Sequence, residues 1–281
     1  MTSGISCTLV CAAALVLFPL GGMDVFSGIS STSSPVKTSS AEASPPRYEF
    51  LRLLGQGVSG EVFLVKRDDG SMVAVKRLFP GEMGRAQVSL RKSQLINHPN
   101  VVRAIETYQA PDSEGTLRDH LVLEFVEGDT LAQTPVGFAA KKQDLRYALE
   151  FLDAIMTAYR CGLAYVDLTT FNIMVNSERV VVIDLKGFEY VHDGMLCRME
   201  TAEQWLYSVL EVTSEILKRG RWEQEELQRV LADLTGVIRD GTEASWHHGP
   251  LSEAPADMVL GRLNAMSQKL YTFKEALGES L

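Results

Sequence analysis

The chain has 281 residues, of which 46% are hydrophobic and 22% charged, and 27 Lys and Arg against 36 Asp and Glu give a formal net charge of −9. This is the composition of a globular protein, which argues against wholesale disorder, a collagen-like repeat or a coiled coil. An acidic chain without a run of lysines and arginines lacks the clustered cations that bind a phosphodiester backbone. Nucleic acid is therefore not an expected partner.

The N-terminal segment has an unusual charge distribution. No charged residue precedes Asp24, and residues 9–20 (LVCAAALVLFPL) are almost purely apolar. That length matches the apolar region of a secretory signal peptide better than the roughly 20 residues of a bilayer-spanning helix. We therefore expect residues 1–23 to be a signal peptide or an uncleaved anchor. The protein is expected to enter the secretory pathway and be secreted, with any membrane attachment made through this segment alone.

Residues 24–46 form a second distinct segment, rich in Ser, Thr and Pro. Such a composition buries too little apolar surface to fold, so we expect a disordered leader before a domain at 47–281. Two cysteines lie beyond the signal segment, Cys161 and Cys197. They could form one disulfide in an oxidising compartment, although two unlinked thiols are slightly favoured.

Two β-rich segments follow the leader, residues 48–65 and 72–78, separated by turn residues DDGS. The first contains glycines at 55, 57 and 60, and the second leads into Lys76 through Val-Ala-Val. A dinucleotide-binding turn has the same glycine spacing, but its last glycine opens a helix, whereas here it leads into a strand. Backbone without a Cβ atom can lie directly over phosphates, and a fixed ammonium group can neutralise them. The alternative is a glycine-rich hairpin with an exposed lysine.

Two isolated acids follow short apolar strands later in the chain. Asp167 lies in LAYVDLTTFNIMV, five residues before Asn172, and Asp184 lies in VVVIDLKG. Together with the glycines and Lys76, these motifs resemble those of the eukaryotic-type protein kinase superfamily, from about Tyr48 to about Leu217. The resemblance implies a bilobal α+β fold, with a β-rich N-lobe at about 47–126 and a helical C-lobe at about 127–281.

The resemblance also implies a mechanism with ATP and Mg²⁺ as cofactors. Lys76 would bind the α- and β-phosphates, and Asp167 would be the catalytic base beside the acceptor hydroxyl. Asn172 and Asp184 would hold magnesium between the phosphates. The segment LVLEFVEG resembles the fifth strand and hinge, with Leu123 as the gatekeeper. The residues implied to contact the nucleotide are Gly55, Gly57, Gly60, Val62, Ala74, Lys76, the backbone of Glu124 and Val126, and Asp129 at the ribose.

The helix αC of the family is the first departure from the pattern. His98-Pro-Asn-Val-Val resembles the turn after αC, and counting back from it puts the glutamate that normally pairs with the strand lysine at Ser89. The segment also looks short for a full αC. Glu82 is the only acid between Lys76 and His98. It is the one residue there that could substitute for the missing glutamate.

The catalytic motifs carry five further changes. The family His-Arg-Asp becomes Tyr165-Val166-Asp167, and the arginine lost at 166 is the usual receptor for a phosphorylated activation loop. Thr169 replaces a lysine beside the γ-phosphate. Lys186 stands where glycine is expected after Asp184, which restricts the backbone, while the preceding leucine can fill the slot of the family phenylalanine.

The activation segment is almost entirely missing in the sequence. Only 19 residues separate Asp184 from Glu203, which resembles the start of helix αF. Residues 143–161 have the apolar period of helix αE, and residues 222–240 and 254–277 are amphipathic helices of the C-lobe. His247 and His248 lie in a loop between the last two. Standard docking of a peptide substrate is in doubt, because the activation segment forms its platform.

Three functions remain open at this point. The favoured one is an ATP-dependent protein kinase with Ser/Thr specificity, active without activation-loop phosphorylation, that acts on a protein substrate. The second is a secreted pseudokinase that serves as a nucleotide-binding scaffold or allosteric partner of another protein. The third is a small-molecule or lipid kinase. The signal segment, Ser-rich leader and reduced activation segment together resemble the secreted effector kinases of intracellular pathogens.

Overall fold

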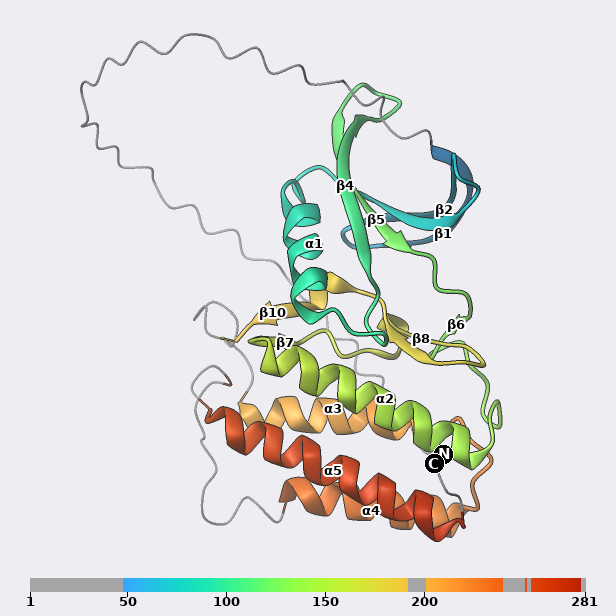
Figure 1. The fold of residues 1–281 in the computed structure, drawn as a ribbon, viewed down its shortest axis with the longest axis vertical. Coiled ribbons are helices and arrows are strands. Elements are labelled where there is room, and N and C mark those ends of the chain that lie inside the picture. The colour runs from blue at the N-terminus through green and yellow to red at the C-terminus, as the bar shows by residue number, and fades with distance from the viewer. Residues whose placement is uncertain (1–47, 192–200, 240–250, 252–253, 279–281) are drawn as a thin grey trace, which may run out of the picture. The chain divides into compact units, whose positions relative to one another are not determined.

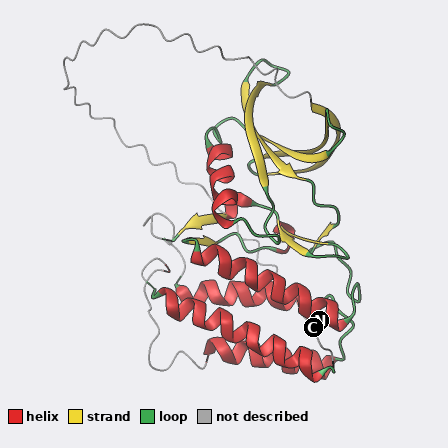
Figure 2. Cartoon of the chain, in the orientation of Figure 1, coloured by secondary structure: helices red, strands yellow, loops and turns green. Residues whose placement is uncertain are grey.

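The computed structural model describes residues 48–191, 201–239, 251 and 254–278. The chain divides into two units, residues 1–44 and 45–281, and all described residues belong to the second. The expected signal segment and leader, Cys197 and the two histidines of the late loop lie outside the described residues. In the second unit, strands and helices are segregated, with one helix packed beside the larger sheet (Figure 2). The α+β class predicted from the sequence is confirmed.

A five-stranded antiparallel sheet forms the N-terminal part of this unit, in the order β1-β2-β3-β5-β4. Its central strands are rich in β-branched residues, and Val65, Val75 and Val122 are fully buried on one face. The expected turn between the second and third strands is present, with Gly70 at φ 84°. The strands are β1 (Tyr48–Gly57), β2 (Gly60–Arg67), β3 (Met72–Leu78), β4 (Ala104–Pro111) and β5 (Leu117–Glu124).

Helix α1 (Arg85–Ile96) lies beside this sheet and packs against β4 and β5 (Figure 1). The helix starts after Gly84, whose φ is 81° and whose N–H donates a hydrogen bond to Asp119 Oδ2 at 2.6 Å. It stops at Asn97, which has a left-handed φ of 38°. Ser89 is buried in the middle of the helix.

Short strands carry the predicted catalytic segments. Asp167 and Asn172 lie between β7 and β8, and Asp184 follows β9 directly. β6, β8 and β9 form one small sheet, and β7 pairs with β10 to form another. Their bounds, with two 3₁₀ turns, are β6 (Asp129–Thr130), β7 (Leu163–Tyr165), η1 (Thr170–Asn172), β8 (Ile173–Val175), β9 (Val180–Val182), η2 (Leu185–Gly187) and β10 (Phe188–Tyr190).

Four helices support these strands from below in Figure 1: α2 (Lys141–Arg160), α3 (Ala202–Leu217), α4 (Gln224–Arg239) and α5 (Ala256–Ala276). The α2 helix starts two residues before the predicted start, in a polar turn that carries no apolar period. Thr201 and Gln204 form a reciprocal capping box at the start of α3. Apolar faces of all four helices meet in a common core. None of the helices that the structure describes is long and apolar enough to cross a membrane.

Candidate active site

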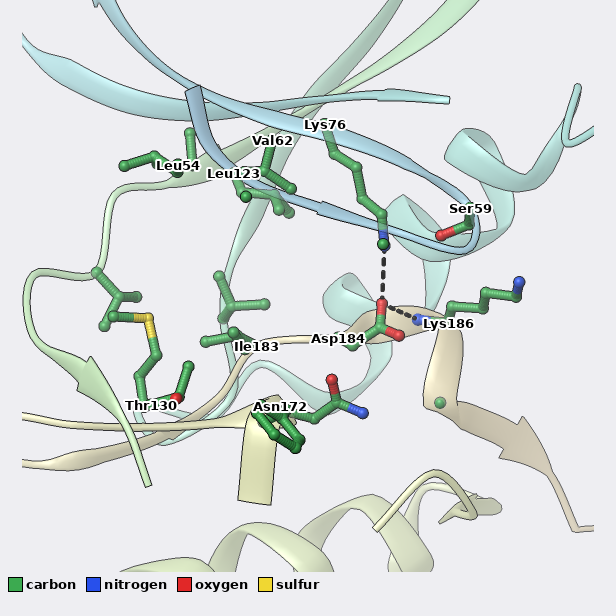
Figure 3. Close-up of a pocket in the computed structure, with 18 of the residues that line it drawn as sticks. Leu54, Ser59, Val62, Lys76, Leu123, Thr130, Asn172, Ile183, Asp184 and Lys186 are labelled. Atoms are coloured by element: carbon green, nitrogen blue, oxygen red, sulfur yellow. Dashed lines mark hydrogen bonds and ion pairs between the residues drawn. The ribbon is translucent and has the colours of Figure 1, made fainter. Parts of the chain in front are cut away.

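A cleft of about 1330 Å³ opens between the five-stranded sheet and the small strands that carry the acids. Lys76, Asp167, Asn172 and Asp184 all line it, although they come from three separate parts of the chain. Figure 3 shows Lys76, Asn172 and Asp184. Every residue that the sequence predicted to contact a nucleotide also lines this cleft. These are Gly55, Gly57, Gly60, Val62, Ala74, Glu124, Val126 and Asp129.

The three glycines of the β1–β2 hairpin are glycines for two different reasons. A Cβ atom at Gly60 would lie 2.2 Å from the backbone oxygen of Arg77, so the neighbouring strand β3 requires glycine there. A Cβ atom at Gly55 or Gly57 would meet nothing within 4 Å. Neither has a positive φ, so the fold itself does not require glycine at these two positions. Bare backbone at this edge of the cleft suits the close approach of a phosphate group.

Lys76 is held directly by the predicted metal ligand. Its Nζ atom donates a hydrogen bond to Asp184 Oδ1 at 3.1 Å, and both side chains are about four-fifths buried (Figure 3). The same oxygen accepts a second hydrogen bond from the backbone N–H of Lys186 at 3.3 Å. The carboxylate is therefore fixed from two sides in a shielded part of the cleft.

The loop after β7 brings Asp167 and Asn172 together. The side-chain amide of Asn172 donates to Asp167 Oδ2 at 2.9 Å and to the backbone oxygen of the same residue at 3.0 Å. The Thr169 N–H also donates to that backbone oxygen at 2.9 Å. Asp167 is exposed in the cleft while its loop is fixed, which is the arrangement that a base acting on an incoming group needs.

Tyr165 and Gly187 support this loop from the adjacent segment. Val166 N–H donates to the backbone oxygen of Gly187 at 2.8 Å, and a Cβ atom at Gly187 would lie 2.5 Å from the Tyr165 ring. The Tyr165 ring packs on Phe188 with 4.5 Å between centroids. Burial raises the pKa of Tyr165, and the nearby Asp184 and Asp167 carboxylates add to that rise. The glycine at 187, and not the residue at 186, is the one that the packing of this segment requires.

The opposite end of the cleft is apolar. Leu54, Val62, Leu123 and Ile183 contribute side chains to it (Figure 3). The Glu124 side chain points elsewhere, because its Oε1 accepts from the Arg103 N–H at 3.1 Å. Only the backbone of this residue is then available to an adenine ring, as the resemblance implied.

Ser89 stands at the position where the family has the αC glutamate. It borders a small cavity of about 20 Å³ that Lys76 and Asp184 also line. Glu82, however, does not substitute for it at the strand lysine. Its carboxylate pairs instead with Arg85 at 2.9 Å and with Lys186 at 3.5 Å. The physical reason is its place before the helix, where these two cations lie closer to it.

The donor set fits magnesium nucleotide better than a permanently bound metal. Within the described ranges, no group of three or more His, Cys, Asp or Glu residues could hold a metal ion. One carboxylate and one amide oxygen, from Asp184 and Asn172, are the set that Mg²⁺ uses when water and substrate phosphates complete its shell. The open glycine edge and Lys76 lie in the same cleft, where they suit those phosphates.

Sequence reasoning missed one support of the site. Trp205 in α3 is fully buried, and its indole N–H donates to the backbone oxygen of Tyr165 at 2.8 Å. The sequence marked this tryptophan only as part of a helix start. A tryptophan in an apolar stripe signals burial, but the partner of its N–H lies forty positions away and has no local signature.

Comparisons with known proteins agree with this geometry. Residues 48–207 match the family model described as protein kinase domain. Ribosomal protein S6 kinase alpha-6 of Mus musculus is 30% identical over 237 residues, which cover 72% of this chain and 30% of that protein. Serine/threonine-protein kinase PknG of Mycolicibacterium smegmatis is 29% identical over 145 residues, which cover 50% of this chain and 19% of PknG. The chain spans less than a third of either relative, and it belongs to the protein kinase domain family.

Proposed function

We propose that the protein is an ATP- and Mg²⁺-dependent Ser/Thr protein kinase that acts without activation-loop phosphorylation. The observation that carries the proposal is the convergence of Lys76, Asp167, Asn172 and Asp184 on one cleft whose glycine edge is left bare. A chain that had abandoned phosphoryl transfer would have no chemical need for all four side chains. The relative PknG, which is named as a serine/threonine-protein kinase, supports the choice of acceptor hydroxyl.

The residues of the cleft divide the work between binding and proton transfer. The bare backbone at Gly55 and Gly57 and the Lys76 ammonium bind and orient the phosphates. Asp167, exposed beside them, orients the acceptor hydroxyl and receives its proton. Asn172 and Asp184 would hold magnesium, which would supply positive charge beside the phosphates. Protein groups thus supply mainly position and charge, which is what phosphoryl transfer requires.

Val166 supports activity without a phosphorylated loop. It stands where the family arginine receives the phosphate, and its side chain packs against the hydrophobic core. Its N–H is bonded to Gly187, so the loop geometry is held by backbone and packing. The short spacing between Asp184 and Glu203 supports the same reading, together with a reduced platform for peptides. Residues 192–200 of that spacing lie outside the described residues.

A second candidate is a pseudokinase that binds nucleotide and works as a scaffold. The observation that favours it is the Lys76 pair with Asp184, because α1 has no acidic residue that could take the lysine away from the metal ligand. A phosphotransferase for small molecules or lipids is a further variant, supported only by the reduced platform.

Secretion is part of the proposal and is supported by the sequence alone. Residues 1–23 act as a signal peptide and residues 24–46 as a leader. N-terminal sequencing of the protein recovered from a secreting host tests this point. A mature N-terminus near residue 24 is expected. Retention of residue 1 would indicate an uncleaved anchor or a failure to enter the secretory pathway.

The deciding experiment is γ-³²P transfer by the full chain to itself and to generic acceptor proteins. Asp167→Ala should lower the rate by roughly 10²- to 10⁴-fold, the usual contribution of a positioned base. Asp233→Ala is the matched control, since Asp233 is an exposed acid on α4 that does not line the cleft. Equal rates for the wild type and Asp167→Ala would overturn the enzyme proposal.

Thermal unfolding separates the candidates further. ATP with Mg²⁺ should raise the midpoint in the wild type and leave it unchanged in Asp184→Ala, because that variant lacks the metal ligand. A shift without transfer identifies the pseudokinase. If ATP with Mg²⁺ leaves the midpoint of the wild type unchanged, nucleotide binding is contradicted for both the kinase and the pseudokinase.

A further inference from the structure

Helix α1 carries basic residues and lacks the glutamate of the family pattern. The helix contains no acidic residue, and its Lys92 is 8% exposed. Burial lowers the pKa of Lys92, and Glu189 and Asp184 are the acids that oppose this shift. The helix therefore offers cations, and no carboxylate, to the segment that follows Asp184. Any attractive link between helix and segment that uses an acid must take it from outside the helix.

Glu82 is such an acid, placed just before the helix. Its Oε2 atom lies 2.9 Å from Arg85 Nη1, in the first turn of α1, and 3.5 Å from Lys186 Nζ in η2. The side chain of Glu82 is 19% exposed and that of Lys186 is 39% exposed. The two contacts are ionic, since Oε2 is buried and makes no aligned hydrogen bond within the described chain. One carboxylate thus joins the helix start to the segment after the metal ligand.

Lys186 completes the connection to the reacting centre. Its backbone N–H donates to Asp184 Oδ1 at 3.3 Å, the oxygen that also accepts from Lys76 (Figure 3). The ammonium group of the same residue is paired with Glu82. The ion pair therefore restricts the residue whose backbone N–H orients the Asp184 carboxylate.

We propose that Glu82 and Lys186 form the electrostatic link between α1 and the metal-binding segment, which makes Lys186 a positioning residue for Asp184. The acid of this link, Glu82, lies beside the helix, and the cation, Lys186, lies in the segment. The link therefore connects α1 to the metal-binding segment without a glutamate on the helix. The inference rests on the proposed function only in assigning magnesium to Asp184. The ion pair itself is a property of the chain without nucleotide.

The test uses the full chain and two readouts that do not depend on phosphate transfer. The first is the Mg²⁺ concentration that half-saturates thermal stabilisation by ATP. The second is amide hydrogen exchange of α1 and residues 185–187 without nucleotide. Lys186→Met and Glu82→Gln should each raise the half-saturating Mg²⁺ about two- to fivefold, the change that a partly exposed ion pair supports. Both variants should also exchange faster in these segments.

Two further variants complete the test. Lys186→Arg keeps the charge and should behave as the wild type. Arg85→Met breaks the contact between Glu82 and α1 while Lys186 is kept, so it should speed amide exchange in α1.

Two results would overturn the proposal. One is a Lys186→Arg variant that performs no better than Lys186→Met. The other is a loss in Lys186→Met without any loss in Glu82→Gln, which would mean that Lys186 acts on the phosphates directly. If ATP and Mg²⁺ fail to stabilise the wild type, the proposed function fails, while the exchange measurement still decides whether the link exists.

Discussion

The glycine-rich hairpin and the catalytic floor, meaning residues 163–190 beneath it, bound the same cleft but are fixed in opposite ways. In the floor, Gly187 is glycine because the Tyr165 ring leaves no room for a Cβ atom. In the hairpin, Gly57 is glycine although a Cβ atom there would meet nothing. The shape of the floor is thus set by the packing of the protein itself. At Gly55 and Gly57 of the hairpin, the packing of the described chain leaves the choice of residue open.

The floor is also tied to the helices beneath it. Trp205 connects α3 to the backbone of Tyr165 in β7. The loop that bears Asp167 follows this strand. The hairpin has no comparable support at its tip, where Val58 is 95% exposed. Substitutions in the floor should therefore change the free energy of unfolding, and substitutions at the hairpin tip should change nucleotide binding.

The largest effect on stability is expected for Trp205→Ala. The variant loses a fully buried indole and its hydrogen bond, and should lower the free energy of unfolding by about 3–5 kcal/mol. Denaturant titration measures this loss. Trp205→Phe keeps most of the volume but leaves the Tyr165 oxygen without its donor, so it should cost about 1–3 kcal/mol. Wild-type stability in Trp205→Ala would contradict the assigned role of this support.

Asp144 provides a second, pH-dependent test beneath the floor. It is fully buried in the first turn of α2, and its carboxylate has no hydrogen bond within the described chain. Burial raises the pKa of Asp144 to about 7, and the nearby Trp222 N–H offsets this rise only in part. Because the folded-state pKa is raised, the contribution of Asp144 to stability is complete below about pH 4 and is lost as the pH rises through about 7.

The Asp144→Asn variant removes this dependence. At pH 8 it should be more stable than the wild type by roughly 2–4 kcal/mol, and the difference should shrink steadily towards pH 4. Urea titrations of both proteins between pH 4 and 8 give the difference curve. A flat curve would show that the carboxylate finds a partner when it ionises.

The smallest and most discriminating effect comes from a matched pair of glycines. Gly187→Ala should cost about 1–3 kcal/mol of stability, because its methyl group overlaps the Tyr165 ring. Gly57→Ala should leave stability within about 0.5 kcal/mol of the wild type. Its apparent ATP affinity should nevertheless fall roughly threefold or more, since the methyl group occupies space left for a phosphate. If Gly57→Ala changes neither quantity, the contrast between floor and hairpin does not hold.

Much of the fold could be predicted from local patterns in the sequence. The alternation of apolar and small residues marked the segment 48–65, and a β-rich run marked 72–78. The apolar period marked α2, and the capping residue Thr201 lies where a helix was expected. Four motif residues were placed in one cleft because their order along the chain resembled a known pattern. Each of these signals lies within a short window of sequence.

Contacts between distant segments could not be predicted in the same way. Glu82 was visible as the only acid near the helix, but its partner Lys186 lies in another segment and was interpreted only as a backbone restriction. The contact of Gly187 with the Tyr165 ring was not predicted either. It arises where β7 pairs with β10, and these two three-residue strands have little signal of their own.

The direct bond between Lys76 and Asp184 has a consequence for the order in which ligands are taken up. A bare magnesium ion must compete with an ammonium group for the carboxylate, and it brings nothing that could satisfy the displaced lysine. A metal that arrives already bound to a triphosphate brings oxygens to which the lysine can turn. Under the proposed function, the cleft should therefore discriminate against the free cation and favour the preformed complex, so that metal and nucleotide load as one unit.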